Sequence, residues 1–503
     1  MANVLLFNPF SAKNGYRIPN SILQVAASIE GKHEYVIIDG NLEKDPWGTI
    51  SEHLENTEFD VFGCTVMPGP QLQQAIPITR KIKRLYPQIT SVWGGYFPSN
   101  QYESVIRSNF VDFIIDGPGD KAFPALINSL VNDQSPENIE NLIFLNNDQI
   151  IKTKKIAIYD QDALPVLPYS KLNEFYPLRK YLKRTFLGKH TAAYHSSMGC
   201  PFTCSFCAVV PIYNARWKGK SANLIVNDIN YLIHQHGADS VEFHDNNFFV
   251  SEKRVVEFSE KITSKSIHWW GEGRIDTIDH FSDKSLEIMR RSGCKMIFFG
   301  AETGNDDVLS QMNKGGTQNA AQIREFAAKM KLFDIIPEYS FVLGLPARTE
   351  KEVNDQIDRD IAFIKEIKEI NPQTEIIIYL YSPVPTAGSE LFEQVTKAGF
   401  RFPANLEDWL NPEWLNFDLR KNPLTPWLKP YMVDKIQGFE TVLNARFPTI
   451  TDTKLTLLQR NWISWFSKLR YQAGIYKYPF ELKVLQHFWL RYRRPETEGF
   501  YMD

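Results

Sequence analysis

The chain has 503 residues, of which 43% are hydrophobic and 23% charged, and its net charge is −3. This balance is typical of a folded protein and gives no indication of nucleic-acid binding, and five unevenly placed cysteines argue against a disulfide framework. The start MANVLLFNPF lacks the pattern of a signal peptide and no apolar run approaches the ~20 residues that span a bilayer, so we expect a cytoplasmic protein without a transmembrane segment.

Residues 1–145 alternate short apolar runs with helical patterns such as residues 71–86. The alternation predicts a doubly wound α/β domain with a parallel sheet, which binds ligands at the carboxyl ends of its strands. Loop sequences follow each predicted strand (NPFSAKNG, DGN, TVMPGP, GGYFPSN and DGPGD), although ordinary turn chemistry explains any one of them equally well. The predicted strands are Val4–Phe7, Tyr35–Asp39, Val61–Val66, Thr90–Trp93 and Phe113–Asp116.

Residues 146–190 have no clean period, and we interpret them as an extended linker. From 191 to 400 a second alternation predicts six strand–helix units, which form a partial (β/α)6 barrel short of the eight units that close one. The predicted helices cover about 222–236, 252–264, 283–292, 316–332, 349–368 and 388–398. The predicted strands are Ala192–Ser197, Ser240–His244, Ile267–Arg274, Met296–Ala301, Glu338–Leu343 and Glu375–Tyr381.

Residues 401–503 are rich in proline and tryptophan and contain long amphipathic stretches such as 454–471. We interpret them as a C-terminal helical domain. Three roles stay open for it: packing against the barrel, covering a substrate mouth, or touching a membrane surface through the basic and aromatic residues of 462–492.

Three of the five cysteines, Cys200, Cys204 and Cys207, lie in the loop GCPFTCSFCAV after the first barrel strand. Thiolates are soft ligands that suit zinc or iron–sulfur clusters. A structural zinc ion needs four protein ligands, so His195 or His244 would have to join them. A cubane cluster held by three thiolates instead leaves one iron open to a small molecule. Of the remaining cysteines, Cys64 and Cys294 lie in apolar strand-like runs and are expected in the core.

The Cys-x3-Cys-x2-Cys spacing, with aromatic Phe206 before the last cysteine and six strand–helix units after it, resembles the radical S-adenosylmethionine (SAM) superfamily. The resemblance implies that Cys200, Cys204 and Cys207 hold a 4Fe-4S cluster whose open iron chelates SAM. It also implies that one electron cleaves SAM to a 5′-deoxyadenosyl radical, which requires an electron donor such as a flavodoxin or ferredoxin.

Further segments match the SAM-contacting positions of that superfamily. HDNNFF at the end of the second strand offers Asp245 and Asn246 for the amino group, and WWGEGRID offers Arg274 for the carboxylate. GAETG contains Glu302, and VLGLP contains Val342 beside the adenine; with Phe206 these complete the implied SAM site. Each residue also has a structural interpretation, because Asp245 could cap a helix, Arg274 could form an ion pair and Glu302 could be structural. The sixth-strand ending YSPVPTAGSEL departs from the usual Pro-Gly-Thr.

An α/β domain before such a barrel resembles the cobalamin-binding subgroup, and this resemblance covers roughly residues 1–400. The Asp-x-His-x-x-Gly motif of histidine-ligated corrin proteins does not occur in this sequence. We therefore expect cobalamin to bind without a histidine ligand, with its lower face near the third-strand loop. The alternative is a relict domain that binds no corrin. Pro118 and Asp120 replace two glutamates usual in the subgroup. The implied cobalamin-binding positions are Thr65, Val66, Gly94, Gly95, Tyr96, Gly117 and Gly119.

Together the two cofactors imply a methyltransferase that methylates an unactivated carbon through a 5′-deoxyadenosyl radical and methylcobalamin. The alternatives are ring oxidation, cyclisation or rearrangement with the same cofactors, and a non-catalytic cluster- or corrin-binding protein, which would cleave no SAM. No residue is singled out as catalytic. The aromatic C-terminal region hints at an apolar or amphiphilic small-molecule substrate, and the residues that could line its pocket are Trp269, Trp270, Tyr379 and Tyr381.

Overall fold

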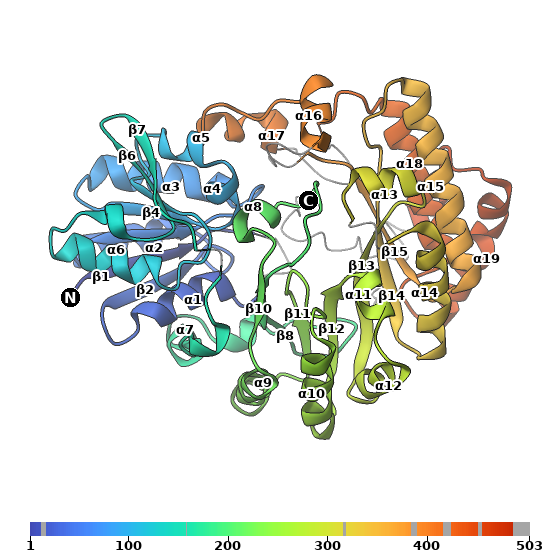
Figure 1. Ribbon diagram of the computed structural model, residues 1–503, viewed down its shortest axis with the longest axis horizontal. Helices are drawn as coiled ribbons and strands as arrows, with labels where there is room; N and C mark the ends of the chain where they lie inside the picture. The colour runs from blue at the N-terminus through green and yellow to red at the C-terminus, as the bar shows by residue number, and fades with distance from the viewer. Residues whose placement is uncertain are drawn as a thin grey trace.

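The computed structural model describes residues 1–11, 17–156, 158–314, 318–383, 390–415, 424–450 and 455–485. An α/β domain forms one end of the molecule, a curved sheet with its helices forms the middle, and C-terminal helices form the other end (Figure 1). This order along the molecule follows the order of the three predicted regions along the chain.

The N-terminal domain is built on a seven-stranded sheet with the order β2-β1-β3-β4-β5-β6-β7, of which the first five strands are parallel. Apolar cores lie on both faces, so the doubly wound prediction is confirmed. The strands are β1 Asn3–Asn8, β2 Glu34–Asp39, β3 Val61–Thr65, β4 Thr90–Gly94, β5 Phe113–Ile115, β6 Leu142–Asn146 and β7 Gln149–Lys152. The helices are α1 Asn20–Ile29, α2 Pro46–Asn56, α3 Leu72–Leu85, α4 Tyr96–Asn100, α5 Tyr102–Ile106 and α6 Ala122–Val131.

The sheet continues past the domain boundary that was placed at residue 145. Strands β6 and β7 form an antiparallel hairpin at its edge, turned by Asn147 and Asp148, both with positive φ. Asparagine and aspartate tolerate that conformation, which a two-residue hairpin turn requires. Beyond it, α7 Tyr169–Phe175 packs Leu172 into the domain core. Residues 146–190 are therefore not a plain extended linker, because much of the segment adds to the first domain.

The middle of the chain forms a six-stranded parallel sheet with the order β15-β14-β13-β12-β11-β8, an open partial barrel as predicted (Figure 1). Its strands are β8 Thr191–Tyr194, β11 Ser240–Phe243, β12 His268–Gly273, β13 Cys294–Glu302, β14 Ile336–Leu343 and β15 Glu375–Leu380. Its helices are α8 Val210–Tyr213, α9 Ala222–His236, α10 Glu252–Ile262, α11 Ile275–Asp279, α12 Asp283–Arg291, α13 Asp306–Gln311, α14 Ala320–Leu332, α15 Glu350–Ile370 and α16 Glu390–Lys397.

The C-terminal helices share the barrel's core. They are α18 Pro430–Arg446, α19 Leu457–Ala473 and α20 Phe480–Val484. Met432, Phe439 and Ile463 are buried in the same apolar cluster as the barrel helices. The predicted amphipathic helix is confirmed as α19, which begins with a capping box between Thr456 and Gln459.

Residues 400–415 form a clamp segment that joins the two domains. This segment contains α17 Pro412–Leu415, and Leu406 and Trp409 pack into a core of the N-terminal domain. Phe400, at its other end, packs into the cluster beside the barrel mouth. The ring of Trp409 meets Phe97 edge-on, 5.0 Å between centroids. The C-terminal region thus fixes the two domains against each other.

Within the described part of the chain, no helix combines the length and apolar character that crossing a bilayer requires.

The clamp segment gives a stability prediction. Trp409→Ala removes a ring that is 8% exposed, and we expect a loss of about 3 kcal/mol in the free energy of unfolding. Trp465→Ala removes a ring that is 72% exposed and should change stability by less than about 0.5 kcal/mol. Urea denaturation of both variants checks this, and equal losses would contradict the clamp.

Candidate functional site

The cysteine loop is closed at its base by a short hairpin. Strand β9 Ser197–Gly199 leads into Cys200 and pairs antiparallel with β10 Trp217–Gly219, which follows the loop. Gly199 has φ +78°, and a Cβ there would overlap the carbonyl of Arg216. Only glycine fits where β9 passes the carbonyl of Arg216. The hairpin therefore holds both ends of the cysteine loop together.

The three thiols lie in one short loop, and two of them have polar donors beside them. Cys204 is buried, and Cys200 and Cys207 are half-buried. Asn247 Nδ2 lies 4.0 Å from Cys200 Sγ, and Arg274 Nη1 lies 3.1 Å from Cys204 Sγ. Burial and the neighbouring sulfurs raise the pKa of the Cys207 thiol to about 12. Three cysteines in one loop supply the soft sulfur ligands that the predicted iron–sulfur cluster requires.

Arg274 follows β12 and reaches the cysteines from the barrel wall. Its guanidinium binds Asp276 through Nε at 2.9 Å and Nη2 at 2.5 Å, and stacks on Phe202 with its Cζ 3.8 Å from the ring centroid. Burial alone would lower the pKa of Arg274, but Asp276 and the cysteine sulfurs raise it overall. The side chain is therefore a fixed cation next to Cys204.

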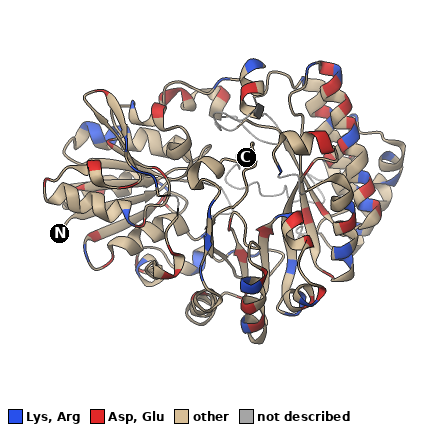
Figure 2. Cartoon of the chain, viewed as in Figure 1, with Lys and Arg blue, Asp and Glu red and all other residues tan. Residues whose placement is uncertain are grey.

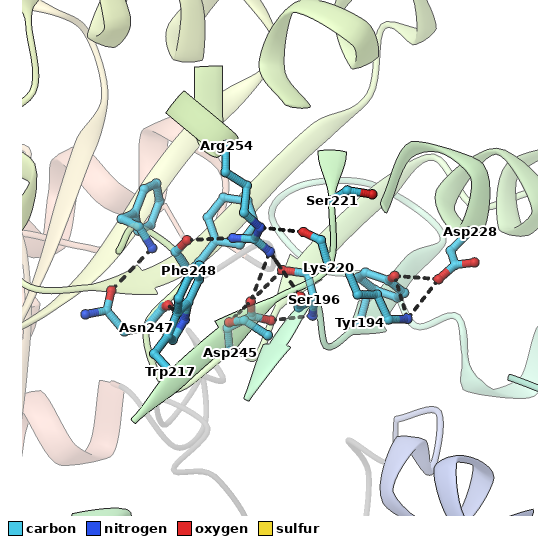
Figure 3. A network of polar contacts seen from close by, with 12 residues as sticks. Tyr194, Ser196, Trp217, Lys220, Ser221, Asp228, Asp245, Asn247, Phe248 and Arg254 are labelled. Atoms are coloured by element: carbon cyan, nitrogen blue, oxygen red, sulfur yellow. Dashed lines mark hydrogen bonds and ion pairs between the residues drawn. The ribbon is translucent and has the colours of Figure 1, made fainter. Parts of the chain in front are cut away.

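Asp245 is fully buried, and its carboxylate accepts hydrogen bonds from neighbouring residues of the protein. It accepts hydrogen bonds from Ser196 N at 2.7 Å, Ser196 Oγ at 2.5 Å and Ser197 Oγ at 2.6 Å (Figure 3). Arg254 Nη2 lies 3.9 Å from the same carboxylate. This position differs from the predicted contact with the SAM amino group: Asp245 ties the end of β11 to the start of the cysteine hairpin.

The network continues through residues that the motif comparison missed. Arg254, on α10, also donates to Lys220 O at 2.8 Å and Phe248 O at 3.0 Å. Lys220 Nζ donates to Tyr194 OH and Asp228, each at 3.0 Å (Figure 3). A sequence signal was present, because Arg254 stands on the apolar face of its helix with buried Val255 and Phe258.

Glu302 ends β13 in a left-handed conformation, with φ +65°. Its carboxylate pairs with Lys314 Nζ at 2.8 Å, and both side chains are almost fully buried. Phe206 and Val342 pack against one apolar cluster at the barrel mouth, which also contains Met312. Three predicted positions, Phe206, Glu302 and Val342, thus lie on strands or loops that end near the cysteine hairpin.

The predicted corrin-binding loops approach the cysteine loop. Gly95 has φ +105°, and a Cβ there would lie 2.7 Å from Val66 O. Tyr96 OH accepts a hydrogen bond from Asn246 Nδ2 at 2.8 Å, so the Gly-Gly loop touches the barrel beside Asp245. Gly117, with φ +107°, faces the carbonyl of Ile212 in α8. Only a residue without a Cβ fits at Gly95, and the two positive-φ glycines let these loops pass close to neighbouring backbone.

Other positions in these loops have structural contacts. Val66 is fully buried, so its side chain lies in the core, whereas Thr65 is half-buried with Oγ1 3.2 Å from Ser21 Oγ. Gly94 and Gly119 are half-buried. Burial raises the pKa of Asp120, beside Gly119, to about 6.

Of the two alternative zinc ligands, His244 faces carboxylates. His244 Nε2 lies 3.3 Å from Glu242 and Nδ1 lies 3.7 Å from Glu272. The ring of His195 stands 6.2 Å from that of His244. Both nitrogens of His244 are therefore directed to acidic groups, which gives the zinc interpretation no support.

The predicted substrate-lining residues divide into two groups. Trp269 is fully buried in the barrel's core, and Tyr381 is 3% exposed in the mouth cluster, so core packing accounts for both. Trp270 and Tyr379 are half-buried. Trp270 Nε1 donates to Glu338 at 3.0 Å. Cys64 and Cys294 are buried, as expected of core residues.

Two known family models match separate parts of the chain. The B12 binding domain matches residues 14–127, and the Radical SAM superfamily matches residues 194–360. The first match contains the positive-φ glycine loops and the second contains the cysteine hairpin. The chain therefore contains a B12-binding domain followed by a radical SAM domain.

Individual relatives are similar over most of the chain. An uncharacterized methyltransferase of Pyrococcus horikoshii is 25% identical over 343 residues, 67% of this chain and 72% of the relative. An anaerobic magnesium-protoporphyrin IX monomethyl ester cyclase of Synechocystis is 28% identical over 327 residues, 62% of this chain and 63% of the relative. The solved structure of the cobalamin-dependent SAM radical enzyme OxsB has a TM-score of 0.69 at 14% identity, covering 99% of this chain and 74% of OxsB, which shows a shared fold.

The position of Asp245 gives a prediction that separates its two interpretations. Asp245→Asn cannot accept the same three hydrogen bonds and leaves Arg254 without a charge partner, so we expect a loss of about 3 kcal/mol or more in the free energy of unfolding. Because Asp245 holds the cysteine hairpin and does not itself contact SAM in this interpretation, any weakening of SAM binding should accompany the loss of stability. Unchanged stability together with weaker SAM binding, measured by calorimetry, would restore the predicted SAM contact. Asp283→Asn, which changes an exposed carboxylate, is the control.

Proposed function

The chain is a radical SAM enzyme with an N-terminal B12-binding domain, and we propose that it methylates an unactivated carbon of a small-molecule substrate. The observation that carries this proposal is the contact between the two candidate cofactor sites. Asn246 of the barrel binds Tyr96 of the first domain, and Lys155 binds both Asp116 at 2.6 Å and Pro211 O at 3.0 Å. Loops from both domains therefore touch, and this contact would bring cofactors bound on them close to each other, as transfer between two cofactors requires.

Each group of residues has a separate task. Cys200, Cys204 and Cys207 would hold the cluster, and Arg274, charged beside Cys204, would bind the SAM carboxylate. The loops at Thr65, Gly95 and Gly117 would hold cobalamin by backbone approach. When bound, these groups supply hydrogen-atom removal from carbon and a methyl group for the carbon that lost the hydrogen.

The substrate is proposed to be apolar or amphiphilic. Phe206 and Val342 are half-buried apolar residues that pack against the cluster at the barrel mouth, and they would offer apolar contacts beside the cysteine loop. The cyclase relative acts, by its name, on a large porphyrin ester. A flavodoxin or ferredoxin as electron donor, a cytoplasmic location and the absence of nucleic-acid binding remain part of this proposal.

The cyclase relative also favours a second candidate function, which is ring oxidation, cyclisation or rearrangement with the same cofactors. The two functions differ in what becomes of SAM. A methyltransferase transfers the SAM methyl group to cobalamin and releases S-adenosylhomocysteine, whereas the second function consumes SAM only as a radical source.

The decisive experiment needs no substrate. The protein is purified without oxygen, reconstituted with iron, sulfide and hydroxocobalamin, reduced, and given SAM with a deuterated methyl group. We expect about four irons per chain together with cobalt, S-adenosylhomocysteine, and the deuterated methyl group on cobalamin by mass spectrometry. Bound cobalt with deoxyadenosine but no S-adenosylhomocysteine would favour the second function. Iron without cobalt would overturn both and leave the first domain a relict.

A cysteine pair provides the matched test of the cluster. Cys204→Ala should lose the iron and all SAM cleavage, because it removes one of the three thiolates proposed to hold the cluster. Cys294→Ala removes a cysteine from the core of β13 and should retain both. Iron content and deoxyadenosine production are the measurements, and deoxyadenosine formed by Cys204→Ala would contradict the cluster assignment.

A further inference from the structure

Helix α19 has two opposite apolar faces, one buried against the protein and the other largely exposed among the residues that the structure describes. Ile463, Ser467 and Tyr471, spaced by four residues, are buried against the rest of the protein. The other face carries apolar residues spaced by four, three and four, which places them in one line along the helix. We call them the outer stripe: Leu458 is 82% exposed, Trp462 51%, Trp465 72% and Leu469 75%.

The exposed apolar surface continues beyond the helix. Arg470 of α19 pairs with Glu481 of α20, which holds the following segment beside the end of α19. Tyr478 and Phe480 stack with their ring centroids 5.7 Å apart. In this segment Ile475 is 51% exposed, Tyr478 71%, Phe480 64% and Val484 55%. So many exposed aromatic and aliphatic residues on one short segment indicate an interaction surface.

The charge of this segment is mostly positive. Residues 455–485 contain five lysines and arginines and one acidic residue, Glu481, whose charge Arg470 balances. Lys468, Lys477 and Lys483 are exposed. The whole chain, by contrast, has a net charge of −3, and Figure 2 shows both signs of charge interspersed over the barrel helices. The basic charge is therefore concentrated where the apolar residues are exposed.

We propose that the outer stripe docks this protein on an anionic lipid surface. Tryptophan and leucine enter the boundary between headgroups and acyl chains, while lysines contact the anionic headgroups, and a lasting attachment needs both. Helix α19 is accessible for this contact, because it lies at the end of the molecule opposite the α/β domain (Figure 1). Pairing with a second copy would bring two sets of lysines together, so charge complementarity favours lipid.

The test is flotation of the full-length protein with vesicles, and it requires neither bound cofactor nor turnover. One set of vesicles is phosphatidylcholine, and the other is an equimolar mixture of phosphatidylcholine and phosphatidylglycerol. We expect the protein to float with the mixed vesicles and to be released by salt, because surface charge attraction is screened. Vesicle binding is measured without any enzymatic reaction. A protein that does not bind vesicles would therefore leave the proposed function unaffected.

Two variants separate the apolar and the charged contributions. Trp465→Ser with Leu469→Ser should weaken binding to mixed vesicles at least about tenfold, since two large apolar side chains are lost. Lys468→Glu with Lys477→Glu should weaken binding to mixed vesicles and leave phosphatidylcholine binding unchanged. Leu332→Ser on α14, where the leucine is 83% exposed outside this surface, should bind as the unchanged protein does.

Three outcomes would overturn the proposal. The first is no flotation with either vesicle, and the second is flotation that survives the loss of Trp465 and Leu469. The third is a dimer, seen by light scattering, that the same double variant converts to a monomer, which would assign the stripe to a second copy. Unchanged thermal unfolding of the variants confirms that they fold, as expected for exposed side chains.

Discussion

The site depends on one buried carboxylate. Asp245 is out of contact with water, and an ionised group there is stable only when hydrogen bonds and a counter-charge replace the lost hydration. Ser196 and Ser197 supply the hydrogen bonds, and Arg254 supplies the charge. These partners come from the end of β8, from β9 and from α10, so satisfying one carboxylate fixes the base of the cysteine hairpin relative to the barrel.

The second constraint is the contact between domains. Asn246, next to Asp245, binds Tyr96, so the network that fixes the cysteines also fixes the Gly-Gly loop of the first domain. The clamp segment acts at a different point, where Trp409 packs on Phe97, the residue after Tyr96. A polar contact at the loop and an apolar contact behind it hold the same short helix, α4. The relative position of the two candidate cofactor sites is therefore determined from both sides.

The fold was predictable from the sequence because parallel strands buried on both faces give apolar runs with clear ends. The β6–β7 hairpin was missed because its strands are short and its turn, Asn147-Asp148, lacks the glycine that usually marks such a turn. Within the site, the cluster and SAM roles of the cysteines and Arg274 stay predictions, and the structure places Arg274 beside Cys204. The role of Asp245 could not be predicted, because a motif shows which residue ends a strand but not whether its side chain points outward or into a network with Arg254.

Glu302 shows how the far wall of the site is held in shape. A non-glycine residue at φ +65° is strained by about 1 kcal/mol or more, and the pairing of β13 with β14 is irregular at this point. The strain persists because the same conformation brings the carboxylate to Lys314, and because Asp360 binds Thr303 Oγ1 at 2.6 Å and Gly304 N at 3.0 Å just beyond it. Burial raises the pKa of Asp360 to about 6. The contacts around Glu302 thus stabilise the turn by more than the backbone strain costs. A strained residue persists in a folded protein only under this condition.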